Sequence, residues 1–203
     1  MSANLHYIEA ALAQHRPRRK LLRPVLKRSA VAMILREREG QSEVLMIKRA
    51  EHEGDPWSGH MAFPGGRMER QDRHGLDVAL RETREEIGHE LDPSTCIGRL
   101  SEIMTHPRLR KRPMVISPYL FRLEREARFK PNYEVDEVIW IPVAFLADAG
   151  NRDSLTWKGS GASFTLPCYR YEGRTIWGLS LMMLDELLTL LPASSLAAET
   201  VGY

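Results

Sequence analysis

FPGGRMERQDRHGLDVALRETREEIG, from Phe63 to Gly88, is the stretch that decides the fold of this 203-residue chain. Its Pro-Gly-Gly sequence at 64–66 can neither continue a strand nor begin a good helix, so it predicts a tight turn whose backbone can approach a ligand closely. After a short loop, the spacing predicts a helix that ends at Gly88, because glycine tolerates the left-handed conformation at a helix C-terminus. A glycine turn, a loop and an acidic helix therefore form one unit.

Three acidic side chains share one face of the expected helix. Glu82, Glu85 and Glu86 stand at relative positions 0, 3 and 4 on a helix of ~3.6 residues per turn. Their like charges repel, and a hard divalent cation with oxygen ligands is the natural group to offset that repulsion. Arg81 precedes Glu85 by four residues, so its guanidinium can hold that carboxylate in place. The alternative is a solvated acidic helix edge without a ligand.

The other face of this helix is largely apolar, and it carries Leu76, Leu80, Thr83 and Ile87. Such a stripe is suited to packing on a β-sheet. β-rich runs that can supply the sheet lie at 29–35, 44–49, 61–63, 97–104, 114–123, 135–141, 157–166 and 168–172. Further helices are expected at 3–15, at 143–146 and at 179–191.

The glycine turn followed by R-E-x-x-E-E-x-G resembles the signature box of the Nudix hydrolases, G-x5-E-x7-R-E-U-x-E-E-x-G-U, where U is a bulky apolar residue. The matching positions are Gly66, Asp72, Arg81, Glu82, Glu85, Glu86 and Gly88. This chain departs from the pattern in having Asp72 at the first acidic position, with one extra residue before Arg81. Thr83 and His89 also stand where the pattern has bulky apolar residues.

Several features are similar to the coenzyme A diphosphatase branch of that family. An Asp with one extra loop residue is one, and the segment PNYEVDEVIWIPVAFL from Pro131 is another. The Ile-Trp-Gly sequence before the last helix is a third, so the resemblance covers roughly Ala30 to Leu191. The branch usually has a basic, arginine-bearing motif after a strand ending in Arg-Ser, where this chain has Lys48-Arg49-Ala50 and then acidic and aromatic residues.

The resemblance implies an α/β protein with the Nudix fold, a mixed β-sheet sandwiched between α-helices. It implies Mg²⁺ or Mn²⁺ bound by Glu82, Glu85 and Glu86, with the Gly65 carbonyl as a further ligand. It also implies a diphosphatase acting on a nucleoside-diphosphate-linked substrate such as coenzyme A. Arg81 belongs to the expected catalytic set, and Glu82 or Glu137 is expected to accept the proton of the attacking water.

Other functions are consistent with the same residues. ADP-ribose, a nucleotide sugar or a nucleoside triphosphate could replace coenzyme A as the substrate. A nucleotide-binding Nudix-fold module without enzymatic activity is the alternative outside the enzymes.

Candidate substrate contacts lie outside the acidic helix. Arg49 and the basic loop that contains Arg108 and Arg110 could meet the phosphates of a diphosphate. Trp57 could stack against a base or anchor its own loop. A solvated surface loop is the alternative for the basic residues.

The rest of the sequence indicates how the chain is organised into segments. We expect an N-terminal helix with a basic linker at 1–28, a Nudix domain at 29–192 and a C-terminal tail at 193–203. Residues 16–28 contain seven basic residues and no acid, which favours a linker, although an RNA-binding segment is the alternative.

The composition is that of a soluble globular protein, with 43% hydrophobic residues, 28% charged residues and a net charge of +2. No secretory signal and no apolar run long enough to span a membrane is present in the sequence, so a cytoplasmic protein without a membrane partner is expected. A nucleic-acid partner is not expected and a homodimer is possible. Cys96 and Cys168 are expected to be reduced and structural.

Overall fold

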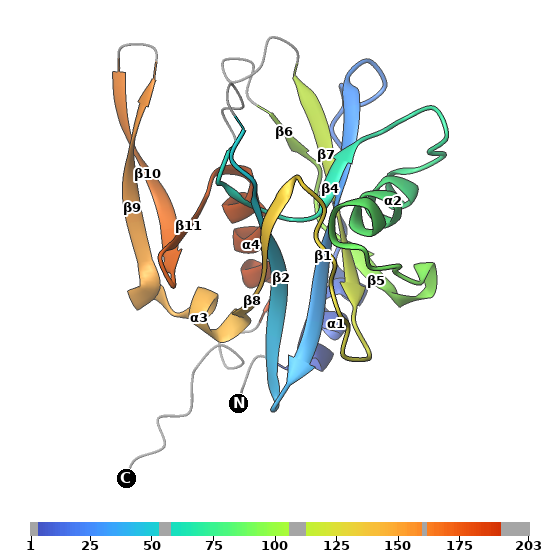
Figure 1. Ribbon diagram of the computed structural model, residues 1–203, viewed down its shortest axis with the longest axis horizontal. Helices are drawn as coiled ribbons and strands as arrows, with labels where there is room; N and C mark the ends of the chain where they lie inside the picture. Colours follow the sequence, from blue (N-terminus) through green and yellow to red (C-terminus); the bar gives the residue numbers. More distant parts are fainter. Residues whose placement is uncertain (1–3, 53–57, 106–112, 160–161, 192–203) are drawn as a thin grey trace.

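The computed structural model of the chain describes residues 4–52, 58–105, 113–159 and 162–191 (Figure 1). The predicted substrate contacts Trp57, Arg108 and Arg110 lie outside the described residues, as does the expected tail at 193–203.

A large mixed sheet forms the centre of the protein, with strand order β3-β2-β1-β7-β5. β4 adds to β1, β6 adds to β7 and β8 adds to β2. The strands are β1 (Lys27–Arg38), β2 (Gln41–Arg49), β3 (Met61–Ala62), β4 (Gly65–Arg67), β5 (Cys96–Arg99), β6 (Ile103–Met104), β7 (Met114–Arg122) and β8 (Val135–Pro142). β1 and β7 run parallel, and the other described pairs in this sheet are antiparallel.

Helices cover both faces of this sheet, as Figure 1 shows. α2 (Gly75–Ile87) packs on one face, and α1 (Leu5–Gln14) and α4 (Gly178–Leu190) pack on the other, with the short α3 (Val143–Ala147) at the end of β8. Side chains alternate along β1, because successive residues of a strand point to opposite faces. Ala32 and Ile34 belong to the apolar cluster under α2, whereas Met33 and Leu35 belong to the cluster under α1 and α4. The expected α/β class and mixed sheet between helices are confirmed.

The N-terminal helix is part of this core. Leu5, Ile8 and Leu12 are buried in the same cluster as residues of α4, so the helix expected at 3–15 is present and packs one side in the core. Within the described ranges, we find no helix long and apolar enough to cross a membrane.

The bounds of three expected strands differ from those observed. The run predicted at 157–166 belongs to two strands, because β9 (Arg152–Gly159) and β10 (Ala162–Tyr171) pair antiparallel with Gly159 opposite Ala162. β10 continues through the second expected strand and pairs with β11 (Arg174–Trp177) to complete a separate three-stranded sheet. The run at 97–104 is likewise divided into β5 and β6.

The buried face of α2 overlaps the predicted stripe in part. Thr83 and Ile87 of that stripe are fully buried, and so are Val78 and Ala79, whereas Leu76 and Leu80 are only half-buried. The helix begins close to β7, since a Cβ atom at Gly75 would lie 3.0 Å from the Tyr119 ring, and this close approach favours small residues on the buried side. The helix ends as predicted, with Gly88 in the left-handed conformation at φ 64°.

Both cysteines are free thiols within the core region. Cys168 is buried and Cys96 is half-buried. Burial raises the pKa of each thiol above its ordinary value, which makes the reactive thiolate scarcer. The expectation that they have only structural roles stays a prediction.

The glycine turn is the first point at which the packing can be tested. A Cβ atom at Gly65 would lie 2.4 Å from the Ala30 carbonyl oxygen, which is backbone of β1 and cannot yield. We expect Gly65→Ala to lower the free energy of unfolding by about 2 kcal/mol, measured by urea denaturation. Gly150→Ala is the control, because its Cβ would meet only the Asp148 carboxylate, at 3.1 Å. Equal losses in the two variants would contradict this account of the turn.

Candidate active site

The glycine turn rests on the carboxylates of α2. The Gly65 N–H donates a hydrogen bond to Oε2 of Glu86 at 2.8 Å. A Cβ atom at Gly66 would lie 2.0 Å from Oε1 of Glu82, so the carboxylate occupies the space that any other side chain would need. Gly66 is therefore required by its close approach to the acidic helix, and Gly65 by its close approach to β1.

Arg81 is the centre of a hydrogen-bond network that joins the turn, the loop and the helix. Its Nη1 donates to Oε1 of Glu82 at 2.9 Å and to Oε2 of Glu85 at 3.0 Å. Its Nη2 donates to Oδ2 of Asp72 and to the Arg67 carbonyl, both at 3.0 Å. The Arg81 side chain is only 9% exposed. The predicted contact with Glu85 is confirmed, and it is one of several.

The contacts of Asp72 explain why position 72 carries an acidic residue. Burial opposes its ionisation, but hydrogen bonds from Arg81 and from the Glu69 N–H bring the pKa of Asp72 below its ordinary value. Because Nε of Arg81 also reaches Oδ1 at 3.2 Å, the pair is bidentate. The shorter Asp therefore still clamps the arginine across the longer loop.

Two carboxylates of α2 are difficult to ionise. Glu86 is 4% exposed, and burial is the largest cause that raises its pKa to about 8, with further contributions from Glu82 and Glu134. Burial likewise raises the pKa of Glu82. Glu85 differs, because its side chain is 47% exposed.

A divalent cation fits this donor set. Within the described ranges, no three His, Cys, Asp or Glu side chains converge on one point, since Glu82 and Glu85 face Arg81 while Glu86 faces the Gly65 N–H. A buried carboxylate whose ionised form is disfavoured gains most from a nearby cation. Oxygen donors of this kind are the ligands that hard cations prefer. The part expected for the Gly65 carbonyl stays a prediction.

Two acids at the start of β8 have different surroundings. The Glu137 carboxylate pairs with Nη2 of Arg174 at 2.6 Å and with Nζ of Lys48 at 3.6 Å. The charge of Glu134, just before the strand, raises the pKa of both Glu82 and Glu86. The role expected for Glu137 stays a prediction.

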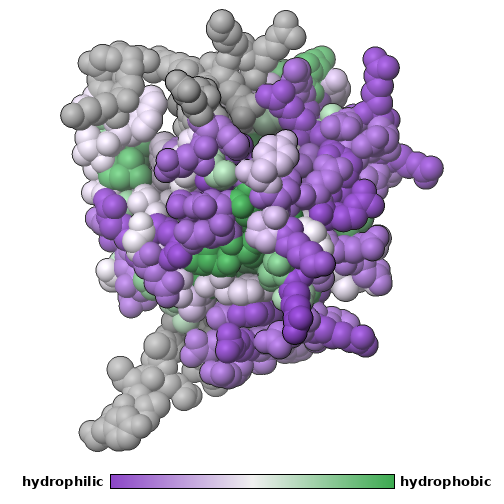
Figure 2. Space-filling view, in the orientation of Figure 1, coloured by the Kyte–Doolittle hydropathy of each residue, from purple (hydrophilic) through white to green (hydrophobic). Residues whose placement is uncertain are grey.

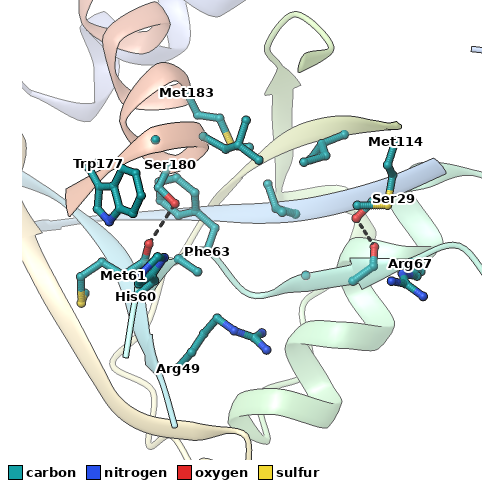
Figure 3. A pocket seen from close by; sticks show the side chains of 17 residues that line it. Ser29, Arg49, His60, Met61, Phe63, Arg67, Met114, Trp177, Ser180 and Met183 are labelled. Atoms are coloured by element: carbon teal, nitrogen blue, oxygen red, sulfur yellow. Dashed lines mark hydrogen bonds between the residues drawn. The ribbon is translucent and has the colours of Figure 1, made fainter. Parts of the chain in front are cut away.

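A pocket of about 440 Å³ adjoins the acidic site. Its walls come from β1, β3, β4, β7 and the start of α4. In Figure 3, Arg49 lies at the edge of the pocket and extends toward α2, and its charge lowers the pKa of Glu86. Arg49 was a predicted substrate contact, and the structure places it between the pocket and the carboxylates.

Several pocket residues were missed by the sequence reasoning. His60 and Trp177 stand edge to face with ring centroids 5.0 Å apart, and Ser180 Oγ donates to the Met61 carbonyl at 3.0 Å. Met183 also lines the pocket beside Ser180, and Met114 lines it on the side away from Trp177 (Figure 3). Trp177 belongs to the Ile-Trp-Gly sequence before α4, and that sequence was the available signal.

The comparisons with known proteins agree with the box geometry. Residues 26–158 match the NUDIX domain family. The chain belongs to the Nudix hydrolase family. It is 30% identical over 135 residues to the mitochondrial coenzyme A diphosphatase NUDT8 of Mus musculus, a match that covers 66% of this chain and 63% of the mouse protein. The chain thus spans less than two thirds of that relative's length.

Other relatives match more of the chain. The uncharacterized Nudix hydrolase NudL of Salmonella paratyphi B is 29% identical over 177 residues, covering 83% of this chain and 88% of that protein. A MutT/nudix family protein from Enterococcus faecalis has the same fold, with a TM-score of 0.56 and 19% identity over 92% of this chain and 67% of its own.

Within this Nudix chain, the departures from the signature pattern keep the packing intact. Thr83 is buried, and its hydroxyl donates to the Ala79 carbonyl at 2.7 Å, so no polar group is left unsatisfied. His89 stands edge to face with Phe129 at 5.6 Å between ring centroids. Burial lowers the pKa of His89, which favours the neutral ring that the apolar position requires.

The Arg81 network makes a prediction about stability. Arg81→Ala should lower the free energy of unfolding by about 3 kcal/mol at neutral pH, because it leaves partly buried carboxylates without their cation. Arg81→Lys should recover only part of this loss, because an ammonium group cannot reproduce the bidentate contact with Asp72.

Urea denaturation measures both variants. Arg84→Ala, an exposed arginine on the same helix, is the control and should change stability by less than about 0.5 kcal/mol. Full recovery with lysine would show that charge alone holds the network together.

Proposed function

We propose that this Nudix chain is a metal-dependent hydrolase that splits the diphosphate of a nucleoside-diphosphate-linked substrate, with coenzyme A or a derivative favoured. The observation that carries the proposal is a pair of carboxylates, the buried Glu86 and the half-buried Glu82. Their raised pKa values favour a cation at this place, beside a pocket large enough for part of a nucleotide. The alternative, a solvated acidic helix edge without a ligand, does not account for Glu86, which is only 4% exposed.

Each residue of the site has a distinct part in this proposal. Glu82, Glu85 and Glu86 would hold Mg²⁺ or Mn²⁺, which when bound supplies charge neutralisation for the diphosphate and a lowered pKa for the attacking water. Arg81 positions Glu82 and Glu85 by its hydrogen bonds. Arg49, at the pocket edge, binds a substrate phosphate.

Proton transfer from the attacking water needs a carboxylate near the metal ligands. Glu82 is one candidate. Glu134 is the other, because its negative charge contributes to the raised pKa of both Glu82 and Glu86. Glu137 is less suited to the task, because its carboxylate is already held by Arg174 and Lys48.

Coenzyme A is favoured over the other diphosphates on two grounds. The mouse relative carries the name of a coenzyme A diphosphatase. The pocket wall is also mostly apolar, with Met61, Phe63, Met114 and Met183 among its residues. Such a wall suits a long, sulfur-bearing arm with methyl and methylene groups better than a second sugar, whose several hydroxyl groups would each need a hydrogen-bonding partner. A cytoplasmic location and a homodimer stay predictions.

A substrate panel tests the assignment. With Mg²⁺ or Mn²⁺ present, we expect coenzyme A to yield adenosine 3′,5′-bisphosphate and 4′-phosphopantetheine, identified by chromatography and mass spectrometry. Because the pocket wall is apolar, ADP-ribose and nucleotide sugars should be turned over more slowly. Turnover of ADP-ribose without any of coenzyme A would replace the substrate within the same reaction class. No hydrolysis of any member of the panel would favour the nucleotide-binding module.

Substitutions of the α2 glutamates test the proposed metal site. Glu86→Gln and Glu85→Gln should fold and should lower turnover by at least about a hundredfold, since charge stabilisation by a metal contributes several kcal/mol to the barrier. The thermal midpoint of the wild type should rise on adding Mn²⁺, because a ligand that binds only the folded state stabilises it, and this rise should shrink in both variants.

Glu90→Gln is the matched control. Glu90 is exposed just beyond the same helix, so its loss should leave both readouts unchanged. If Glu86→Gln matches the wild type at limiting Mg²⁺, the acidic face is not the metal site.

A further inference from the structure

The basic segment 16–28, which the sequence favoured as a linker, is fixed to the edge of the sheet. The Glu102 N–H donates to the Arg18 carbonyl at 2.9 Å, and the Lys20 N–H donates to Oε2 of Glu102 at 2.8 Å. Arg23 Nε lies 2.7 Å from Oε1 of the same carboxylate. Glu102 is 3% exposed, so one buried acid holds both the backbone and a side chain of the segment.

This anchor presents a folded turn to solvent. The Arg23 N–H donates to the Lys20 carbonyl, and the Val25 N–H donates to the Leu22 carbonyl, each at 3.1 Å. Leu21, Leu22 and Val25 are 95%, 56% and 78% exposed. A single exposed leucine is ordinary, but three apolar side chains held outward within five residues form a surface that gains from contact with an apolar phase.

Basic side chains surround this apolar tip. The exposed ones are Arg16, Arg18, Arg19, Lys20, Lys27 and Arg28, and the segment contains no acidic residue. Glu102 does not offset them at the surface, because it is buried and paired with Arg23. In Figure 2, a green patch with purple residues beside it stands at the top edge, where Figure 1 shows the chain entering β1.

We propose that the turn at 20–25 docks the protein on an anionic lipid bilayer. Leu21, Leu22 and Val25 enter the boundary between headgroups and acyl chains, and the surrounding arginines and lysines meet the lipid phosphates. The contact is peripheral, which is compatible with the finding that no described helix could span a membrane.

The composition of the turn favours lipid over nucleic acid. Single-stranded RNA is held by basic grooves together with aromatic side chains on which bases stack. Residues 16–28 contain no aromatic residue, and exposed leucines gain nothing from a phosphate backbone. Exposed apolar side chains surrounded by basic ones instead match an anionic membrane, whose acyl chains can take up the apolar groups and whose headgroups attract the basic groups.

Docking in this way brings one wall of the pocket close to the membrane. Lys27, two residues after the turn, pairs in register with Met114 of β7, and Met114 lines the pocket. The docked protein therefore holds this wall near the bilayer.

Vesicle sedimentation with the full chain tests the proposal. The wild type should bind vesicles of phosphatidylcholine with phosphatidylglycerol and should bind pure phosphatidylcholine weakly, with binding falling as salt rises. Leu21→Asp should weaken binding about tenfold or more, because burial of a leucine is lost and a negative charge is added. Arg19→Ala should weaken it about fivefold, the change that ~1 kcal/mol per basic residue gives.

Phe164→Asp is the matched control, because Phe164 is an exposed apolar residue on the distant β10 hairpin. It should bind vesicles as the wild type does, and thermal melts should show that the variants fold. The proposal fails if the wild type does not sediment with anionic vesicles at low salt, or if Leu21→Asp binds them as well as the wild type. It also fails if the chain binds an RNA oligonucleotide, unaffected by Leu21→Asp, while leaving vesicles unbound.

Discussion

The Arg81 guanidinium is the interaction on which the rest of the site depends. It joins Asp72 in the loop, Glu82 and Glu85 on α2, and the Arg67 carbonyl at the end of the glycine turn. Without the Arg81 guanidinium, the buried side chain of Asp72 would lose its charged partner, and the repulsion between Glu82 and Glu85 would not be offset. The network also explains how the chain tolerates a longer loop, because the bidentate contact fixes the loop from within.

The site keeps charges where folding disfavours them. Glu86 is nearly fully buried, and its pKa is raised to about 8, mainly by burial. The folded protein is therefore less stable with an ionised Glu86 than it would be with a neutral side chain at this position. A fold retains such a group where a ligand offsets the cost, which is the usual conflict between stability and function. The apolar part of the pocket wall shows no such conflict, because its methionines and Phe63 carry no charge.

The sequence predicted the acidic helix, its glycine stop and the Arg81–Glu85 contact, because these follow from spacing along one element, and the family resemblance implied the mixed sheet. It did not predict that Val78 and Ala79 are buried more deeply than Leu76 and Leu80, since Gly75 lies against Tyr119 and this close approach favours small side chains. Nor did it indicate that the charge of Glu134 acts on the α2 carboxylates, because this depends on the pairing of β2 with β8, where the register shifts between Lys48 and Arg49. The clamp on residues 16–28 depends on Glu102, far away in the chain, which no local pattern indicates.

The parallel pairing of β1 with β7 sets the order in which the protein can assemble as it is synthesised. β1 is the central strand, yet its partner is made only after the glycine turn, α2 and β5 have all left the ribosome. Until then one edge of β1 has no partner, and its row of buried apolar residues is open to wrong contacts. Pairings of such long range close slowly. The acidic helix is therefore complete as a segment well before the sheet that will support it, and slower translation before β7 would lengthen the interval in which this chain is prone to aggregate.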